Sequence, residues 1–277
     1  MVHPAESPLR TRVQNAAHEL LDHLGVRPRV GMLLGTGHGS ISAQLKNKSL
    51  LRRQDLPAGV VLAEESHLIG GTLEGVPVVV GDPPLAPYEG HGLQDVTFPV
   101  RVLQAMGCEL LILTAGASSL SRHLEPGSIA IVEDHLNFSN LHPLQGAQYQ
   151  TLGPRFPDMS EPYARRWRKR AREVGAEIGM HCLEGVFAAV PGPSLPTRAE
   201  YRFLRRAGAD LVGMSLVPEV LAAVHSGLEV LALVGVMQVV HVESSSPADI
   251  EDLLDAADIA APRMASLLTG IVRSLAE

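Results

Sequence analysis

A glycine-rich stretch near residue 35 combines residue types that can bind a small anion. The apolar run Met32-Leu33-Leu34 ends in Gly35-Thr36-Gly37-His38-Gly39-Ser40, and an amphipathic segment follows. This order predicts a strand, a glycine loop and a helix. Closely spaced glycines let backbone N–H groups point at an anion, and the helix N-terminus and the Thr36 hydroxyl would add to them. The alternative is an ordinary strand-to-helix turn that binds nothing.

The spacing of these glycines excludes the two common nucleotide-binding loops. No glycine occupies the sixth position that a dinucleotide fingerprint requires, and the Lys-Ser/Thr pair of a P-loop is missing. Free phosphate therefore fits the loop better than a large cofactor does. A dinucleotide-dependent oxidoreductase is a distant alternative.

Two further predicted strand ends carry small or polar residues. The loop Ala115-Gly116-Ala117-Ser118-Ser119 is expected after a strand over 110–114, and Met214-Ser215 after a strand over 211–212. Ligands of open α/β sheets sit at the carboxyl ends of the strands. We therefore expect both segments and Thr36 to converge on one cleft.

Strands and helices alternate along the chain, which predicts an α/β fold. Helices are expected over 10–24, after the glycine loop, and over 96–106, 162–175, 197–207, from 218 onward and over 248–275; further strands are expected over 60–62, 75–80, 128–133, 183–190 and 229–240. Thr197 is expected to cap its helix, with Glu200 in the capping-box position. The pattern predicts a mixed, mostly parallel central sheet flanked by helices, in one domain over 1–277 with a loose N-terminal segment over 1–8.

Composition narrows the function classes. The chain has 277 residues, 45% of them hydrophobic, and a formal net charge of −7. The acidic balance argues against a nucleic-acid partner, which would need a basic face. The cationic helix expected over 162–175 is therefore interpreted as a solvated face or a subunit contact. The sequence predicts no signal peptide and no membrane span, and its two cysteines, Cys108 and Cys182, fit the reducing cytoplasm.

The chain also carries a series of short motifs. They are Tyr88-Glu89-Gly90, Val96-Thr97-Phe98-Pro99-Val100-Arg101, Pro126-Gly127-Ser128-Ile129, Asp134-His135-Leu136-Asn137, Arg155-Phe156-Pro157-Asp158-Met159-Ser160, Gly192-Pro193-Ser194 and the run from Gly208 to Glu219. In these motifs and their order the chain resembles the trimeric purine nucleoside phosphorylases and the related methylthioadenosine phosphorylases. The resemblance extends from Val30 to Leu267.

This resemblance implies phosphorolysis of a purine nucleoside to free base and ribose 1-phosphate by a homotrimer. Phosphate would be the co-substrate, with no metal and no organic cofactor. The residues that the resemblance places at phosphate are Thr36, His67 and Ser215. Those it places at the nucleoside are Tyr88, Ala115, Gly116, Ala117, Met214, Gln238 and, across a subunit interface, Phe156. It assigns no catalytic residue.

Several positions depart from the family pattern. Pro84-Leu85-Ala86 stands where the family has an Arg-x-His clamp for phosphate, and Pro196 stands at its purine-anchoring glutamate. Gln238 and Ala115 each replace an asparagine. Each lost charged contact removes roughly 2–4 kcal/mol of transition-state binding. A catalytically inactive homologue that binds a ligand or joins a partner subunit is therefore an open alternative, as is a phosphorylase of 5′-modified nucleosides.

Other polar side chains near the expected cleft are candidates for replacing the missing donors, although a structural or surface role is the simpler interpretation for each. They are His38, His91, Ser118, Ser119, Arg122, His123, His241 and Glu243.

Overall fold

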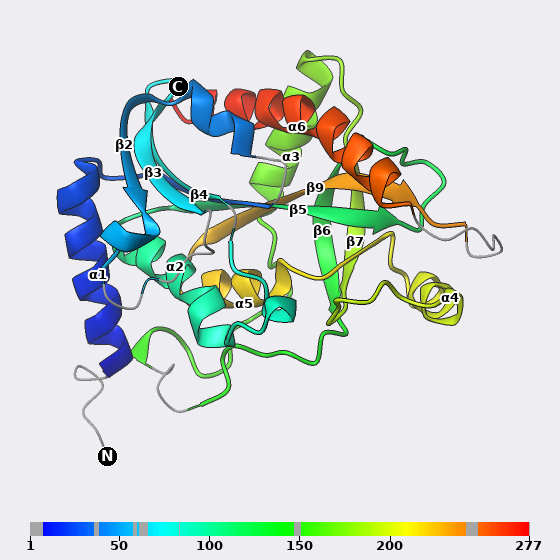
Figure 1. The fold of residues 1–277 in the computed structure, drawn as a ribbon, viewed down its shortest axis with the longest axis horizontal. Helices are drawn as coiled ribbons and strands as arrows, with labels where there is room; N and C mark the ends of the chain where they lie inside the picture. Colours follow the sequence, from blue (N-terminus) through cyan, green and yellow to red (C-terminus); the bar gives the residue numbers. More distant parts are fainter. Residues whose placement is uncertain are drawn as a thin grey trace.

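A mixed β-sheet forms the centre of the protein (Figure 1). The computed structural model describes residues 8–35, 39–57, 60, 66–82, 84–146, 151–241 and 249–276. The strands in these ranges are β1 (Val30–Leu34), β2 (Lys46–Arg52), β3 (His67–Leu73), β4 (Val76–Asp82), β5 (Leu110–Ser119), β6 (Ile129–Asn137), β7 (Leu183–Ala189), β8 (Leu211–Gly213) and β9 (Glu229–Val239).

The strand order is β2-β3-β4-β1-β5-β8-β7-β6-β9, and β9 also pairs with β5. Strands β5, β8, β7, β6 and β9 therefore form a closed ring, and β1 to β4 extend from it as an open sheet. The pairings of β1 with β4 and β5, of β5 with β9, and of β7 with β6 and β8 are parallel. The other pairings are antiparallel, so the sheet is mixed, as the sequence predicts.

Helices cover both faces of the sheet. They are α1 (Pro8–Leu24), α2 (Leu93–Ala105), α3 (Arg165–Glu177), α4 (Arg198–Arg206), α5 (Val217–His225) and α6 (Ile250–Arg273). Helices α1, α2 and α5 lie on one face, α3 and α6 on the other, and α4 lies beside the ends of β6 and β7 (Figure 1). Successive residues of β5 alternate between the two hydrophobic cores, with Leu110 and Ile112 in one and Leu111 and Leu113 in the other.

The sequence misassigns the segment after the glycine loop. The predicted helix is a six-residue 3₁₀ helix, η2 (Gly39–Gln44), and the strand β2 follows it directly. The β2 strand escaped prediction because it pairs only with β3 in the described sheet and Leu51 is its one buried residue, so its sequence lacks apolar alternation.

The sequence predicts no strand between 62 and 75, where the structure has the strand β3. Gly70 and Gly71 lie within this strand because no side chain fits there. A Cβ on Gly70 would lie 2.8 Å from Val26 Cγ1, and one on Gly71 would lie 2.8 Å from the Lys46 carbonyl oxygen. The strand predicted over 60–62 falls mostly outside the described residues, and Val60 is not in a strand.

The predicted loop Ala115–Ser119 is the second half of β5. It pairs with β9 along its length and with β8 at Ser118 and Ser119, so its backbone is fixed by two neighbouring strands. Small side chains are required here, because a Cβ on Gly116 would lie 3.1 Å from Met237 Cγ. The other predicted helices and strands are present, with bounds that differ by a few residues.

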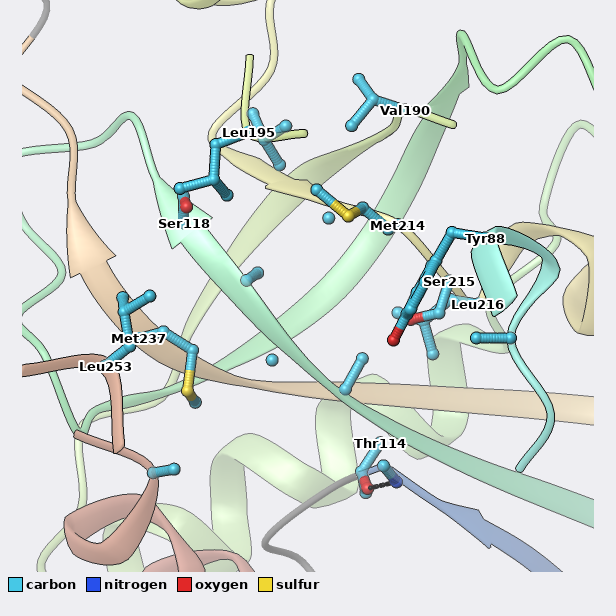
Figure 2. A pocket seen from close by; sticks show the side chains of 18 of the residues that line it. Tyr88, Thr114, Ser118, Val190, Leu195, Met214, Ser215, Leu216, Met237 and Leu253 are labelled. Carbon is cyan, nitrogen blue, oxygen red and sulfur yellow. Dashed lines mark hydrogen bonds between the residues drawn. The ribbon is translucent and has the colours of Figure 1, made fainter. Parts of the chain in front are cut away.

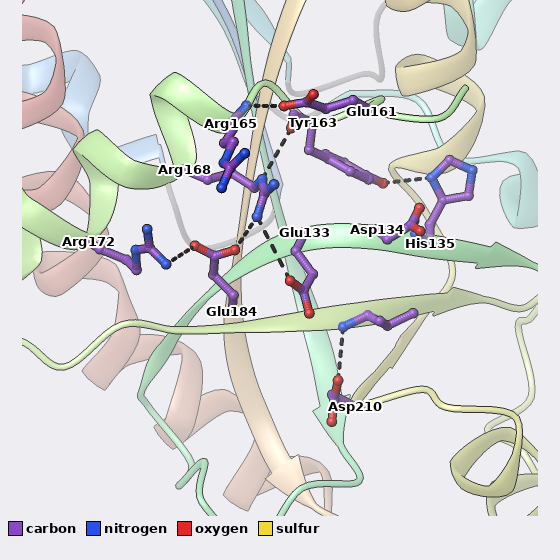
Figure 3. Close-up of polar contacts among 11 residues, drawn as sticks. Glu133, Asp134, His135, Glu161, Tyr163, Arg165, Arg168, Arg172, Glu184 and Asp210 are labelled. Carbon is purple, nitrogen blue, oxygen red and sulfur yellow. Dashed lines mark hydrogen bonds and ion pairs between the residues drawn. The ribbon is translucent and has the colours of Figure 1, made fainter. Parts of the chain in front are cut away.

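Arginine side chains of α3 form ion pairs within the protein. Arg168 pairs with Glu184 and Glu133, and Arg172 Nη1 lies 2.7 Å from Glu184 Oε1 (Figure 3). These carboxylates belong to β6 and β7, so the helix is held against the sheet by charge as well as by its buried apolar face.

Both cysteines are buried free thiols, and burial raises the pKa of each, to about 12 for Cys108 and about 11 for Cys182. None of the helices described here has the length and apolar character that a membrane span requires.

Candidate functional site

A pocket of about 480 Å³ opens where the second half of β5 meets the ends of β1, β8 and β9 (Figure 2). Its volume lies in the range of sites for drug-sized ligands. Segments from eight parts of the chain line it: 33–35, 84–89, 113–118, 190–196, Tyr201 of α4, 212–219, 237–238 and 250–257.

The pocket brings together most of the residues that the sequence singles out. Tyr88, Met214, Ser215 and Gln238 line it, as do Ala115, Gly116 and Ala117. Met214-Ser215 and the 115–119 segment therefore converge as expected. Thr36 lies outside the described residues, although its neighbour Gly35 lines the pocket. The ligand contacts of all these residues stay predictions.

Two predicted site residues do not line this pocket. His67 lies in β3 opposite Asp82 of β4, and its charge partly offsets the rise that burial produces in the Asp82 pKa. Phe156 is 84% exposed and its ring lies 5.3 Å from the Arg155 guanidinium carbon. Their predicted roles at phosphate and across a subunit interface are therefore not explained by this pocket.

The glycine loop begins tightly against β5. The Gly35 amide donates to the Thr114 hydroxyl and to the Thr114 carbonyl oxygen, both at 3.0 Å (Figure 2). A Cβ on Gly35 would lie 2.8 Å from that carbonyl oxygen. Only glycine fits at position 35. Because it has no side chain, the loop backbone lies directly against the pocket wall.

Tyr88 lies on a single turn of 3₁₀ helix, η4 (Pro87–Glu89). Glu89 Oε2 accepts a hydrogen bond of 3.2 Å from the Ala86 amide, and Gly90 ends the turn with φ 91°. Partial burial, together with the charge of Glu89, raises the pKa of Tyr88, so its hydroxyl stays protonated at neutral pH. The Tyr88 ring reaches toward Ser215 in Figure 2.

Ser215 lies two residues before α5. Its neighbour Leu216 has φ 74°, a left-handed conformation that is strained for leucine and is found most often at functional sites. The N-terminus of α5 adds a positive dipole end, although the Val217 amide donates to the Ser215 carbonyl oxygen at 3.0 Å and Pro218 has no N–H. Met214 is fixed by close packing, because a Cβ on Gly192 would lie 2.5 Å from its sulfur. The Ser215 side of the pocket can therefore hold an anion.

A buried carboxyl group, Glu219, lines the same side of the pocket. The residue is 3% exposed, and its Oε2 has no hydrogen-bond partner among the described residues. Burial raises the pKa of Glu219 to about 7. Burial raises the pKa of Tyr163, and the charges of Asp134 and Glu219 add to that rise. The Tyr163 hydroxyl lies 3.1 Å from His135 Nδ1 (Figure 3).

The side of the pocket opposite Ser215 is mostly apolar and contains a small group of polar side chains. Leu195, Met237 and Leu253 form its walls (Figure 2). Gln238 Nε2 donates a hydrogen bond of 3.0 Å to Ser118 Oγ. The two residues are opposite each other in the β5–β9 pairing, next to a register shift. Tyr201 of α4 lies beside Ser118. The sequence pattern does not single it out, because its position on an amphipathic helix indicates only a core residue.

A second hollow, of about 1050 Å³, adjoins this side of the pocket and shares Tyr201 and Gln238 with it. Arg122 and His241 line the second hollow. His91, Ser119 and His123 line neither hollow, and His38 and Glu243 lie outside the described residues.

Charged groups are scarce in the main pocket. Glu89 and Glu219 are the charged residues in its described lining, which contains no arginine, lysine or histidine. Pro84, Leu85 and Ala86 line it instead. The described residues also contain no group of three or more His, Cys, Asp or Glu that could hold a metal ion.

Comparisons with known proteins agree with this geometry. The profile of the Phosphorylase superfamily matches residues 29–273. Purine nucleoside phosphorylase 1 of Geobacillus stearothermophilus is 36% identical over 271 residues, which cover 97% of this chain and 99% of that protein. The crystal structure of Schistosoma mansoni purine nucleoside phosphorylase in complex with adenosine superposes with a TM-score of 0.91 at 32% identity, over 96% of this chain and 97% of that one. A schistosoma purine nucleoside phosphorylase in complex with hypoxanthine gives the same values.

Proposed function

Because this chain belongs to the phosphorylase superfamily, we propose that it catalyses the phosphorolysis of a purine nucleoside to free base and ribose 1-phosphate. The observation that carries the proposal is the pocket in which Tyr88, Met214, Ser215 and Gln238 meet. Relatives named purine nucleoside phosphorylase align with nearly the whole chain, which supports the same reaction here.

The two sides of the pocket suit the two parts of this reaction. Phosphate would bind beside Ser215 and the α5 N-terminus, where the Ser215 hydroxyl can donate to its oxygens and the helix dipole favours negative charge. The base would lie between Leu195, Met237 and Leu253, with the Gln238 amide at its edge. When the glycosidic bond breaks, negative charge develops on the base, and a hydrogen-bond donor in this position stabilises it. The enclosed geometry holds phosphate and sugar in line.

The proposal includes a cytoplasmic homotrimer that uses phosphate as its co-substrate and no metal or organic cofactor. The exposed Phe156 side chain would then reach the pocket of a neighbouring subunit. Buried free thiols fit a reducing compartment. Light scattering coupled to size-exclusion chromatography tests the trimer directly.

A second candidate is a catalytically inactive homologue that binds a nucleoside. It is favoured by one observation: Pro84 and Ala86 line the pocket, and its described lining has no cationic side chain to hold phosphate. This candidate predicts nucleoside binding without turnover.

Base release distinguishes the two candidates. The full-length protein is incubated with inosine, guanosine, adenosine or methylthioadenosine, with and without phosphate, and the products are separated by chromatography. The first candidate predicts release that requires phosphate, and a Michaelis constant for phosphate that rises about five- to tenfold in Ser215→Ala. Nucleoside binding in calorimetry without any release supports the second candidate. Release that does not depend on phosphate refutes phosphorolysis.

A further inference from the structure

We propose that Ser118, Tyr201 and Gln238 form an uncharged hydrogen-bonding cluster that recognises the base and accepts 6-aminopurine and 6-oxopurine nucleosides alike. The inference rests on the proposed function, because it names the substrates of that same pocket. It depends on where these three side chains lie, on the hydrogen-bonding capacity that they keep for a ligand, and on their lack of charge.

The first observation is the pairing of Gln238 with Ser118. One hydrogen of the Gln238 amide is used in the 3.0 Å bond to Ser118 Oγ. An amide group has a second N–H and a carbonyl oxygen, so it can still donate to a ligand and accept from it. The bond to Ser118 fixes the direction of the amide, and Ser118 itself is buried at 8% exposure.

The second observation is the buried hydroxyl of Tyr201. The side chain is 6% exposed, packs with Leu204 and Val212, and lines the pocket. Its oxygen lies beside the Ser118 hydroxyl, at the limit of hydrogen-bonding geometry. Burial raises the pKa of Tyr201, and the neighbouring Ser118 hydroxyl partly offsets that rise. A hydroxyl group both donates and accepts, so its contact with Ser118 leaves capacity for a hydrogen bond to a ligand.

The third observation is the position of the cluster within the pocket. Ser118 lies with Leu195, Met237 and Leu253 on one side in Figure 2, while Tyr88, Ser215 and Leu216 lie on the other. Apolar walls next to a polar cluster fit a flat heterocycle that has hydrogen-bonding atoms along one edge. The anion-binding features of the described lining, Ser215 and the α5 N-terminus, belong to the other side, so the cluster meets the base and not the phosphate.

The chemistry of the cluster determines which bases fit. A carboxylate only accepts hydrogen bonds, so it selects bases that present N–H groups. Both carboxyl groups in the described lining of the main pocket, Glu89 and Glu219, belong to the segments next to Tyr88 and Leu216, and Asp249 and Asp252 line only the second hollow. Hydroxyl and amide groups both donate and accept. A 6-oxo group can therefore accept from the cluster, and a 6-amino group can donate to it.

The test compares kcat/KM for adenosine and inosine in the wild type and in Tyr201→Phe. We expect the two wild-type values to agree within about tenfold, and the substitution to lower both by about three- to tenfold. Thr97→Val is the matched control, since it also removes one buried hydroxyl and Thr97 does not line the pocket. It is expected to leave both values unchanged, while thermal unfolding confirms that each variant is folded.

Binding of free adenine and hypoxanthine, measured by isothermal titration calorimetry, gives a readout that is independent of turnover. Tyr201→Phe should raise the dissociation constants of adenine and hypoxanthine by a similar factor. The inference is overturned if the wild type prefers one base by more than about 100-fold, or if Tyr201→Phe binds and cleaves as the wild type does. If binding of the bases depends on Tyr201 but no nucleoside is cleaved, the role of the cluster in base recognition is supported and the proposed phosphorolysis is wrong.

Discussion

Replacing Glu219 with glutamine is expected to change the pH dependence of stability in the ligand-free protein. Burial raises the pKa of Glu219 from 4.5 in the unfolded chain to about 7 in the folded protein. Below pH 4.5 the group is protonated in both states and has no effect. Above pH 7 it is ionised in both, and the folded state then contains a buried unpaired charge. The shift of about 2.5 pKa units corresponds to about 3 kcal/mol.

Wild-type stability should therefore fall, relative to Glu219→Gln, as pH rises from about 4.5 to 7, and stay constant above that. Between pH 5 and pH 8 the difference in free energy of unfolding should change by about 2 to 3 kcal/mol in favour of the variant. His225 has its pKa lowered to about 4 by burial and by the charge of Arg101, which gives the opposite slope. This contribution is present in both proteins and cancels in the comparison.

Urea unfolding at pH 5, 6, 7 and 8 in phosphate-free buffer measures this difference. Phosphate is left out because an anion in the pocket would add its own effect on the carboxyl group. If the difference between the two proteins is the same at every pH, Glu219 does not titrate in this range and the argument from its burial is wrong.

Three further substitutions test separate parts of the structure. Thr197→Ala removes the side chain that accepts from the Glu200 amide at 3.3 Å, and should lower the free energy of unfolding by about 1 kcal/mol in urea titration; an unchanged midpoint contradicts the capping role. Gly70→Ala places a Cβ 2.8 Å from Val26 Cγ1 and 2.9 Å from Leu24 Cβ of α1. We expect a loss of about 1–3 kcal/mol in the same assay, and a neutral result would mean that the end of α1 moves away from β3 easily. Arg168→Met leaves the Glu184 carboxylate, which is 13% exposed, without one of its two arginine partners. The midpoint of thermal unfolding should fall by several degrees. An unchanged midpoint would show that Arg172 alone is sufficient to pair with Glu184.

Much of the fold could be predicted from local sequence signals. Helix α4 is a clear case, because Thr197 and Glu200 form the reciprocal capping bonds that their spacing predicts. The apolar runs of β5 and β9 identify buried strands in the same way. Strand β2 lacks such a signal because six of its seven residues are not buried. Strand β3 is obscured by two glycines whose purpose is close packing against α1 and β2, a contact between segments distant in sequence.

The candidate site was partly predictable for the same reason. Met214-Ser215 follows a short strand, which marks it as a ligand-binding segment, and the structure places it in the pocket. Residues 115–119 were expected in a loop because small residues are typical of turns, but strand pairing on both sides keeps them extended. Tyr201 has no local signal at all, since its role depends on which strand ends α4 faces.

The closed ring of strands has a consequence for how this site can diversify. The floor of the pocket is strand backbone from β5, β8 and β9, which is hydrogen-bonded on both sides and changes little when a side chain is replaced. The walls come from separate segments, including 84–89, 190–196 and the start of α6. New specificities can therefore arise by exchanging one wall at a time, and a library that varies these segments while keeping the floor should retain the fold in most of its members.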